Sequence, residues 1–417
     1  MPSHPQRPHQ ACTNGEVGVL RELTRRYLDV CAKPVQQTRR ELWRRKNALE
    51  PTPPLIYARA FAWAEMPDSQ CRCEDPFFRH YENQLRHDMF WDTLDDDAVF
   101  EPWLTVTATY TCTGWGVEAT RRHSDQPRGS WKADYPLKSL DDIERLRPPF
   151  HAIDEARTAR DAARLADAVG DLIPINVDRR PYYYHWHADL STDLGYLRGI
   201  ENFMLDMMEN PAGLHRLMAF MRDGVLRAQQ QAEDAGDWGL CDHANQAMPY
   251  VHGLRDPAAN VTGVSRGELW NFTASQETTL VGPDMFGEFM LDYQRPIMEH
   301  FALSAYGCCE DLTRKIDTLR RVRNLRRIAV APAADVARCA EQIGTDYVVS
   351  YRPSPTDMVG YGFDPYRIRR IVTADLDACR GCDVDITLKD VETVQRDPTR
   401  VARWVRIVRE IIDDLTG

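Results

Sequence analysis

The chain has 417 residues, of which 43% are hydrophobic and 28% charged, a composition typical of a globular protein. With 52 basic and 63 acidic residues, its formal net charge is −11, which argues against nucleic-acid binding as its main role. No stretch approaches about 18 consecutive apolar residues, so no membrane span is expected. Residues 1–10 are polar and lack an apolar signal core, so we expect a cytoplasmic protein whose 11 cysteines are thiols.

The N-terminal part of the chain is dominated by helical patterns. Amphipathic periodicity predicts helices over residues 16–31 and 36–48, and an aromatic-rich helix follows over residues 75–94. A proline-rich break at residues 51–54 separates the second of these helices from the third. The alternating, β-branched residues 105–111 then predict a strand.

From about residue 150 onward, predicted strands and helices alternate with short connections. The predicted strands cover residues 172–177, 239–242, 269–274, 304–308, 327–331, 347–351 and 384–388. The predicted helices cover residues 153–169, 200–209, 211–232, 283–301, 312–322, 334–343, 365–378 and 398–415. Strict alternation of this kind is typical of a parallel sheet with helical crossovers, and an early strand brings the number of strands to about eight.

The predicted fold class is therefore α/β, a (β/α)8 TIM barrel with an N-terminal helical extension. The expected division is residues 1–130 for the extension and first strand region, and residues 131–417 for the barrel. A doubly wound dinucleotide-binding sheet is disfavoured because Val177 is followed by Asp-Arg-Arg-Pro-Tyr rather than by a glycine-rich turn.

In such a barrel the chemistry takes place where the strands end, and two adjacent thiols stand at one of these positions. The segment Tyr306-Gly-Cys308-Cys309-Glu310 follows a predicted strand and combines soft and hard metal ligands. The metal-ligand candidates from all strand ends are Cys308, Glu277, Cys309 and His243. The alternatives are that one cysteine is a small buried hydrophobe and that Glu277 caps the next helix.

Further polar side chains follow the other predicted strands. The catalytic candidates are Asp390, Lys389, His185, His187 and Tyr306, which include groups suited to proton transfer. The substrate-binding candidates are Arg179, Tyr184, Asn245 and Arg352, whose arginines suit carboxylates or phosphates. Other interpretations stay open: the two histidines flank Trp186 in an aromatic run and suit packing equally well, and Lys389 with Asp390 suits an internal ion pair.

Several passages from Trp131 to the C-terminus resemble the uroporphyrinogen decarboxylase-like superfamily. They are residues 136–146 (PLKSLDDIERL), 197–203 (LRGIENF), 282–289 (GPDMFGEF), 306–308 (YGC) and 397–401 (DPTRV). The superfamily includes the decarboxylase itself and zinc-dependent methyltransferases that use coenzyme M, corrinoid proteins or methyl ethers. The resemblance implies a (β/α)8 barrel with an N-terminal helical extension.

The methyltransferase branch has His-x-Cys after one strand and a further Cys near the end of the last strand. Cys308 matches the first Cys, whereas Tyr306 stands at the His position and Lys389-Asp390 at the last Cys position. Zinc accepts sulfur, nitrogen and oxygen ligands, so Cys309, Glu310, Glu277, His243 or Asp390 are candidate replacements. The resemblance thus implies zinc as cofactor, a small methylated substrate and a methyl-corrinoid on a separate protein.

Three functions follow from these residues. The first is a metal-assisted methyltransferase or demethylase. The second is a metal-independent decarboxylase or lyase, in which Arg179, Arg180 and Arg352 bind substrate carboxylates. The third is a catalytically silent small-molecule-binding protein on the same fold. The oligomeric state stays open, with a homodimer as one option.

The pair Cys379 and Cys382 has a spacing that suggests redox or metal chemistry. It comes just before the strand predicted at residues 384–388, which places it at the N-terminal face of the barrel, where residues serve stability. Gly381 between the two suits the end of a helix. We therefore predict that both cysteines lie far from Cys308 and bind no catalytic metal.

Overall fold

The computed structural model describes residues 14–59, 61–124, 131–240 and 247–416. Eight parallel strands in two sheets form its framework. The larger sheet has the order β1-β10-β9-β8-β7-β6, and β2 pairs with β5 in a smaller sheet. The strands are β1 (Leu55–Ala58), β2 (Leu104–Thr107), β5 (Ile175–Asp178), β6 (Trp270–Thr273), β7 (Leu303–Tyr306), β8 (Leu325–Val330), β9 (Val348–Tyr351) and β10 (Val384–Leu388).

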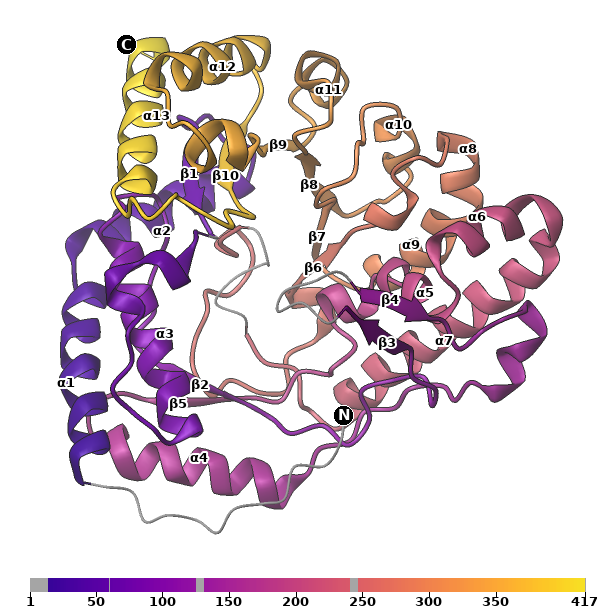
Figure 1. The fold of residues 1–417 in the computed structure, drawn as a ribbon, viewed down its shortest axis with the longest axis horizontal. Coiled ribbons are helices and arrows are strands. Elements are labelled where there is room, and N and C mark those ends of the chain that lie inside the picture. Colours follow the sequence, from indigo (N-terminus) through magenta and orange to yellow (C-terminus); the bar gives the residue numbers. More distant parts are fainter. Residues whose placement is uncertain (1–13, 60, 125–130, 241–246, 417) are drawn as a thin grey trace.

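Figure 1 shows the larger sheet curling into half of a barrel, with α10 (Ile316–Leu319), α11 (Val336–Ile343), α12 (Pro365–Ala378) and α13 (Arg400–Thr416) on its outer side. Within the described residues, β1 does not pair with β2, and β5 does not pair with β6. The predicted barrel is therefore confirmed only in part: the sheet is parallel and curled, but the barrel is not closed.

The strand predictions after residue 150 hold for β5 to β10, and β10 has the predicted bounds. Residues 239–240 of the strand predicted at 239–242 are not in a strand, and residues 241–242 lie outside the described part. Two features were missed. Strand β1 is only four residues long and follows directly on the prolines, and β3 (Thr120–His123) and β4 (Trp131–Asp134) form an exposed antiparallel hairpin.

The predicted N-terminal helices are confirmed as α1 (Asn14–Cys31), α2 (Pro34–Asn47) and α3 (Pro76–Asp92). Helix α3 starts where expected because the Asp75 carboxylate accepts hydrogen bonds from the backbone N–H groups of Phe77 and Phe78. The other confirmed helices are α4 (Glu155–Val169), α6 (Ile200–Glu209) and α7 (Pro211–Asp234), together with α11, α12 and α13.

Two helix predictions need correction. The helix expected over residues 283–301 consists of α8 (Pro283–Phe286), a π-helical turn (Gly287–Leu291) and α9 (Asp292–Met298), which accommodates Pro296. The helix expected over residues 312–322 is reduced to the single turn α10. A further short helix, α5 (Ser191–Leu197), precedes α6.

The C-terminal end of α2 is tied to the larger sheet by hydrogen bonds of Asn47. Asn47 donates to the carbonyls of Met248 and Tyr250 and accepts a hydrogen bond from the buried Arg327 of β8. Arg327 also pairs with Asp385 of β10, and the two side chains are only 2% and 0% exposed. Since β1 and β2 precede residue 131 and supply strands to the two sheets, the division at residue 131 stays a prediction.

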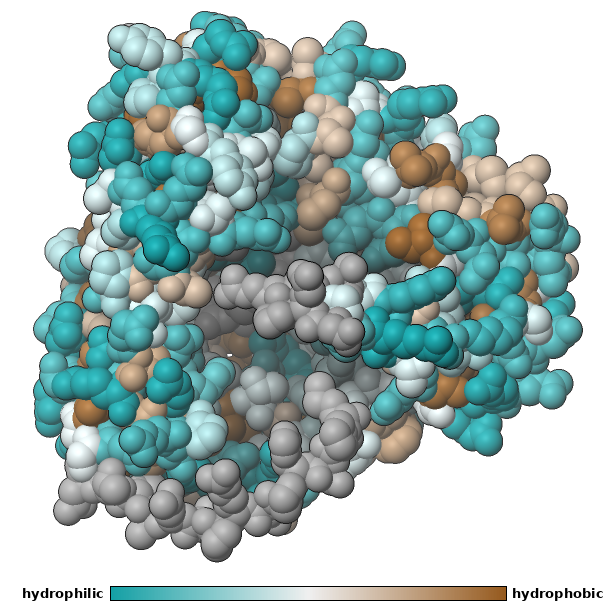
Figure 2. Space-filling model, viewed as in Figure 1, coloured by the Kyte–Doolittle hydropathy of each residue, from teal (hydrophilic) through white to brown (hydrophobic). Residues whose placement is uncertain are grey.

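The face of the molecule seen in Figure 2 is largely hydrophilic and is hollowed near its centre. Hydrophobic side chains gather at one side of this face, and Leu205 and Met208 of α6 are among the exposed apolar residues. No helix of the described residues is long and apolar enough to cross a bilayer.

Candidate functional site

The two adjacent thiols lie in a tight turn after β7, which is called the thiol turn (residues 307–310). Glu310 holds this turn in place: its carboxylate accepts the backbone N–H of Cys308 and that of Ser275, each at 2.7 Å. Glu310 is only 1% exposed, so its oxygens serve the backbone rather than a ligand. The sulfur atoms of Cys308 and Cys309 lie 3.4 Å apart; Cys308 is buried and Cys309 is exposed.

Gly307 is the residue on which this turn depends. Its φ is +99°, and a Cβ atom there would lie 2.7 Å from Leu312 Cδ1 and 2.9 Å from Ala329 Cβ. We expect Gly307→Ala to lower the free energy of unfolding by ~2–4 kcal/mol, because backbone strain and overpacking add. Chemical denaturation measures this loss.

Gly344→Ala is the matched control for that substitution. Gly344 also has a positive φ, +53°, but a Cβ atom there would meet nothing within 4 Å. Only the backbone cost of ~1–3 kcal/mol is then expected, without the overpacking that adds to it at Gly307. Equal losses at the two positions would contradict a close-packed turn at Gly307.

Lys389, which directly follows β10, reaches the thiol turn. Its Nζ donates to Cys309 Sγ at 3.2 Å and forms an ion pair with Asp390, whose Oδ2 lies 3.6 Å from the same sulfur. Burial alone would lower the pKa of Lys389, but the two thiols and Asp390 outweigh it and raise this pKa. The neighbouring Cys308 and burial raise the pKa of Cys309, and Lys389 opposes that rise.

Arg352, which directly follows β9, binds the backbone of the thiol turn. It is 3% exposed, and its guanidinium donates to the carbonyl oxygens of Gly307 at 2.9 Å and Cys308 at 2.7 Å. Burial lowers the pKa of this guanidinium. Predicted as a substrate-binding residue, Arg352 makes structural contacts that fix the position of the thiols.

An arginine that the sequence analysis did not select lies next to Lys389. The parallel register pairs Ala58 of β1 with Leu388 of β10, so Arg59 and Lys389 are neighbours at the ends of adjacent strands. Arg59 is half-buried, and among the described residues its guanidinium makes no hydrogen bond or ion pair. The sequence feature that could have identified it is the short apolar run Leu55 to Ala58, which Arg59 follows directly.

The aromatic run after β5 lies partly beside the thiols. Trp186 packs on Phe272 with ring centroids 4.7 Å apart, and it covers the small apolar cluster that includes Cys308. Tyr184 donates to the carbonyl of Trp270 at 2.5 Å and stacks on His185 at 3.7 Å. His187 stacks on Tyr182 at 4.0 Å. These contacts show that Tyr184 and both histidines take part in aromatic packing.

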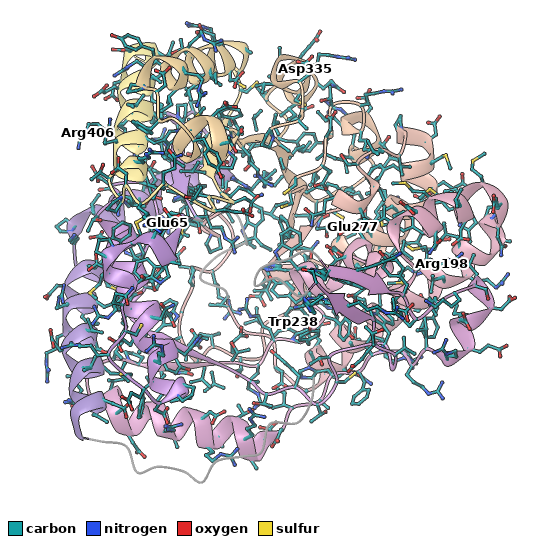
Figure 3. The ribbon with its side chains drawn as sticks, in the orientation of Figure 1. Glu65, Arg198, Trp238, Glu277, Asp335 and Arg406 are labelled. Carbon is teal, nitrogen blue, oxygen red and sulfur yellow. The ribbon has the colours of Figure 1, made fainter. Side chains whose placement is uncertain are left out.

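Glu277 lies in a separate group of carboxylates between β6 and α5 (Figure 3). It accepts a hydrogen bond from the Ser191 hydroxyl at 2.6 Å. Burial, with the charge of Glu277 as a further cause, raises the pKa of nearby Asp193 to about 6. Ser275, whose N–H donates to Glu310, also contacts Ser191, so this group adjoins the thiol turn through hydrogen bonds.

The remaining predicted site residues are placed as follows. Arg179 pairs with Glu155 and Asp237 at 2.6 and 2.5 Å. Tyr306 is 1% exposed and donates to Gln294 at 2.8 Å. Both side chains are thus engaged within the protein. His243 and Asn245 lie outside the described residues.

The donors at the thiol turn are a poor match for zinc. Cys308, Cys309 and Asp390 offer two sulfurs and a carboxylate, but the Lys389 ammonium contacts both Cys309 and Asp390, where a metal cation would compete with it. In the part of the chain that the structure describes, no group of three or more His, Cys, Asp or Glu side chains is arranged for a metal ion. Zinc therefore stays a prediction.

Cys379 and Cys382 lie where the sequence analysis placed them. Cys379 ends α12, Gly381 has a φ of +85°, and Cys382 precedes β10. The two thiols are thus at the N-terminal end of β10, whereas Lys389 and the thiol turn are at the other end of the strand.

Comparison with known proteins finds similarity among solved structures only. No family model matches the chain, and no curated protein matches it. Among solved structures, it is similar to a methyltransferase from Methanosarcina mazei, with 12% identity, a TM-score of 0.47 and coverage of 91% of this chain and 98% of that chain. At that identity, the residues of the site have to carry any conclusion about function.

Proposed function

We propose that this chain is a methyltransferase that removes a methyl group from a small methylated substrate at the C-terminal ends of the strands. The observation that carries the proposal is the contact between Lys389 Nζ and Cys309 Sγ at 3.2 Å, beside a second thiol. This cation opposes the rise that Cys308 and burial cause in the pKa of Cys309, and so favours one thiolate, the reactive form of cysteine, on the pair. The resemblance of several passages to zinc-dependent methyltransferases supports the same class.

In the proposed reaction, the thiolate of the Cys308–Cys309 pair attacks the methyl carbon. A sulfur–carbon bond forms, the bond between that carbon and the donor atom breaks, and the donor atom keeps the bonding electrons. An amine leaving group then takes a proton from solvent, whereas a sulfide leaves as the neutral molecule. Lys389 stabilises the negative charge on the pair before the attack, and Trp186 shields one side of Cys308 from water. The sulfur–carbon bond then breaks as the methyl group passes to a second acceptor, and the cysteine sulfur keeps the electrons and returns to the thiolate. We propose that this acceptor belongs to a separate corrinoid protein.

No specific observation favours decarboxylation. Arg180 is paired with Asp178 at 2.6 Å, Arg179 is paired with two carboxylates, and Arg352 is buried beneath the thiol turn. The arginines on which that alternative depends are therefore engaged within the protein.

The test is labelling of the thiols by a methyl donor. The full chain is incubated with trideuteromethyl-labelled trimethylsulfonium and tetramethylammonium, and the peptide that contains Cys308 and Cys309 is analysed by mass spectrometry. We expect one labelled methyl group on the pair, lost in Cys308→Ser/Cys309→Ser and retained in the control Cys112→Ser, a half-buried thiol elsewhere. An unlabelled pair, together with no demethylated product when a reduced corrinoid protein is added, would refute the proposal. Elemental analysis of the same sample tests the zinc prediction.

A further inference from the structure

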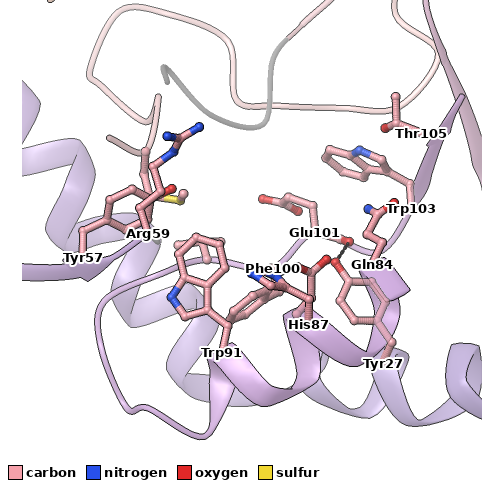
Figure 4. Close-up of a pocket in the computed structure, with 13 residues that line it drawn as sticks. Tyr27, Tyr57, Arg59, Gln84, His87, Trp91, Phe100, Glu101, Trp103 and Thr105 are labelled. Atoms are coloured by element: carbon pink, nitrogen blue, oxygen red, sulfur yellow. Dashed lines mark hydrogen bonds and ion pairs between the residues drawn. The ribbon is translucent and has the colours of Figure 1, made fainter. Parts of the chain in front are cut away.

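A cavity of about 440 Å³ lies against the N-terminal segment (Figure 4). Its walls come from the end of β1, one face of α3 and the segment that leads into β2. Strands β1 and β2 border one of the two gaps in the barrel of the described residues, so the cavity lies where β1 and β2 do not pair. A volume of this size is within the range of small-molecule sites, which starts at ~300 Å³.

With one exception, the charged side chains that line this cavity already have hydrogen-bonding partners. Glu101 receives two hydrogen bonds from Arg40 at 3.1 and 3.0 Å, and it also accepts from Tyr250. Asp88 lies 3.0 Å from His87 Nδ1. Arg59 is the exception: within the described part of the chain it has no hydrogen-bonding or ion-pair partner. One cation therefore remains to attract an anion.

The rest of the wall is aromatic. Trp91 is fixed by its neighbours, with ring centroids 5.4 Å from Tyr57 and 5.7 Å from Phe100, and its N–H donates to Asp96. Trp103 is different, because this half-buried indole makes no ring contact and no hydrogen bond with another described residue. Figure 4 shows Trp103 and Arg59 on opposite sides of the cavity. An open aromatic face opposite a cation suits a flat ring that carries an acid group.

We propose that this cavity binds a flat aromatic carboxylate of one or two rings, with the acid group on Arg59 and the ring against Trp103. A carboxylate fits better than a phosphate dianion, because Arg59 is a single cation and matches one negative charge. In the chain register, Arg59 follows β1 next to the position where Lys389 follows β10. This goes beyond the proposed methyl transfer, since it assigns a ligand to a different cavity.

The experiment is isothermal titration calorimetry of the full chain with 2-naphthoate and with its uncharged counterpart 2-naphthamide. For the wild type, we expect 2-naphthoate to bind at least tenfold more tightly than the amide. Arg59→Gln should remove that preference, and Trp103→Leu should weaken both ligands. The control Arg216→Gln changes an exposed arginine on α7 and should leave both affinities unchanged.

Two results would overturn the assignment: a wild type that binds the acid no better than the amide, or an Arg59→Gln variant that keeps the preference. The comparison of 2-naphthoate with 2-naphthamide on the wild type needs no variant, so it can overturn the assignment even if a substitution impairs folding. Binding is measured without turnover. A chain that binds 2-naphthoate but transfers no methyl group would overturn the proposed function alone, and the reverse result would overturn this site alone.

Discussion

Replacing Arg327 with methionine is expected to lower the free energy of unfolding by ~3–5 kcal/mol. Arg327 and Asp385 are 2% and 0% exposed, so the substitution leaves a buried carboxylate without its cation. Among the described residues, Asp385 would keep hydrogen bonds from the Ser350 and Thr387 hydroxyls, at 2.9 and 3.2 Å, and Asn47 would lose the donor at its Oδ1. The shift of the urea unfolding midpoint measures the loss.

Two further variants separate the buried charge from the loss of a large side chain. Arg323→Met removes an ion pair with Glu299 at 3.0 Å in which Arg323 is 79% exposed, so we expect a loss of ~1 kcal/mol or less. The double substitution Arg327→Met with Asp385→Leu removes both buried charges and should recover much of the stability lost in the single variant. A double variant less stable than Arg327→Met would show that the unpaired carboxylate is not the cause.

The parallel architecture could be predicted because short runs rich in β-branched and apolar residues, such as β9 and β10, alternate with helices. Their bounds follow from the side chains that have to be buried. Whether the strands close into a complete barrel could not be predicted in the same way. Whether β1 pairs with β2 depends on how α3 crosses between them, and no local pattern in the sequence records that crossing.

Site residues could be predicted from the sequence only where they directly follow a strand whose end the sequence also predicts. Cys309 and Lys389 are 80 residues apart along the chain and meet because β7 and β10 end at the same face of the curled sheet. Arg59 was missed because β1 is four residues long and follows prolines, so its end was not seen as part of that face. Arg179 was assigned to the substrate because its partners Glu155 and Asp237 lie on other elements, which sequence spacing does not reveal.

The largest effect on reactivity is expected from Lys389→Met. Two thiolates 3.4 Å apart would repel each other, so the Cys308–Cys309 pair carries at most one negative charge near neutral pH. The Lys389 ammonium, 3.2 Å from Cys309 Sγ, is the cation that stabilises this charge. Without it, we expect alkylation of chelator-treated protein by iodoacetamide at pH 7 to slow about tenfold or more, since a neighbouring cation shifts a pKa by ~1–3 units.

The pH profile of alkylation distinguishes this electrostatic effect from a change in access to the thiols. Without Lys389, the thiolate forms only at higher pH, so the profile should move toward alkaline pH and the two proteins should react alike once both are ionised. Asp390→Asn should act in the opposite sense, because the Lys389 ammonium would no longer share its charge with a carboxylate. A Lys389→Met protein that reacts more slowly by the same factor at every pH would instead mean that the thiols had become less accessible. The Lys389–Cys309 contact would then have no electrostatic role in their reactivity.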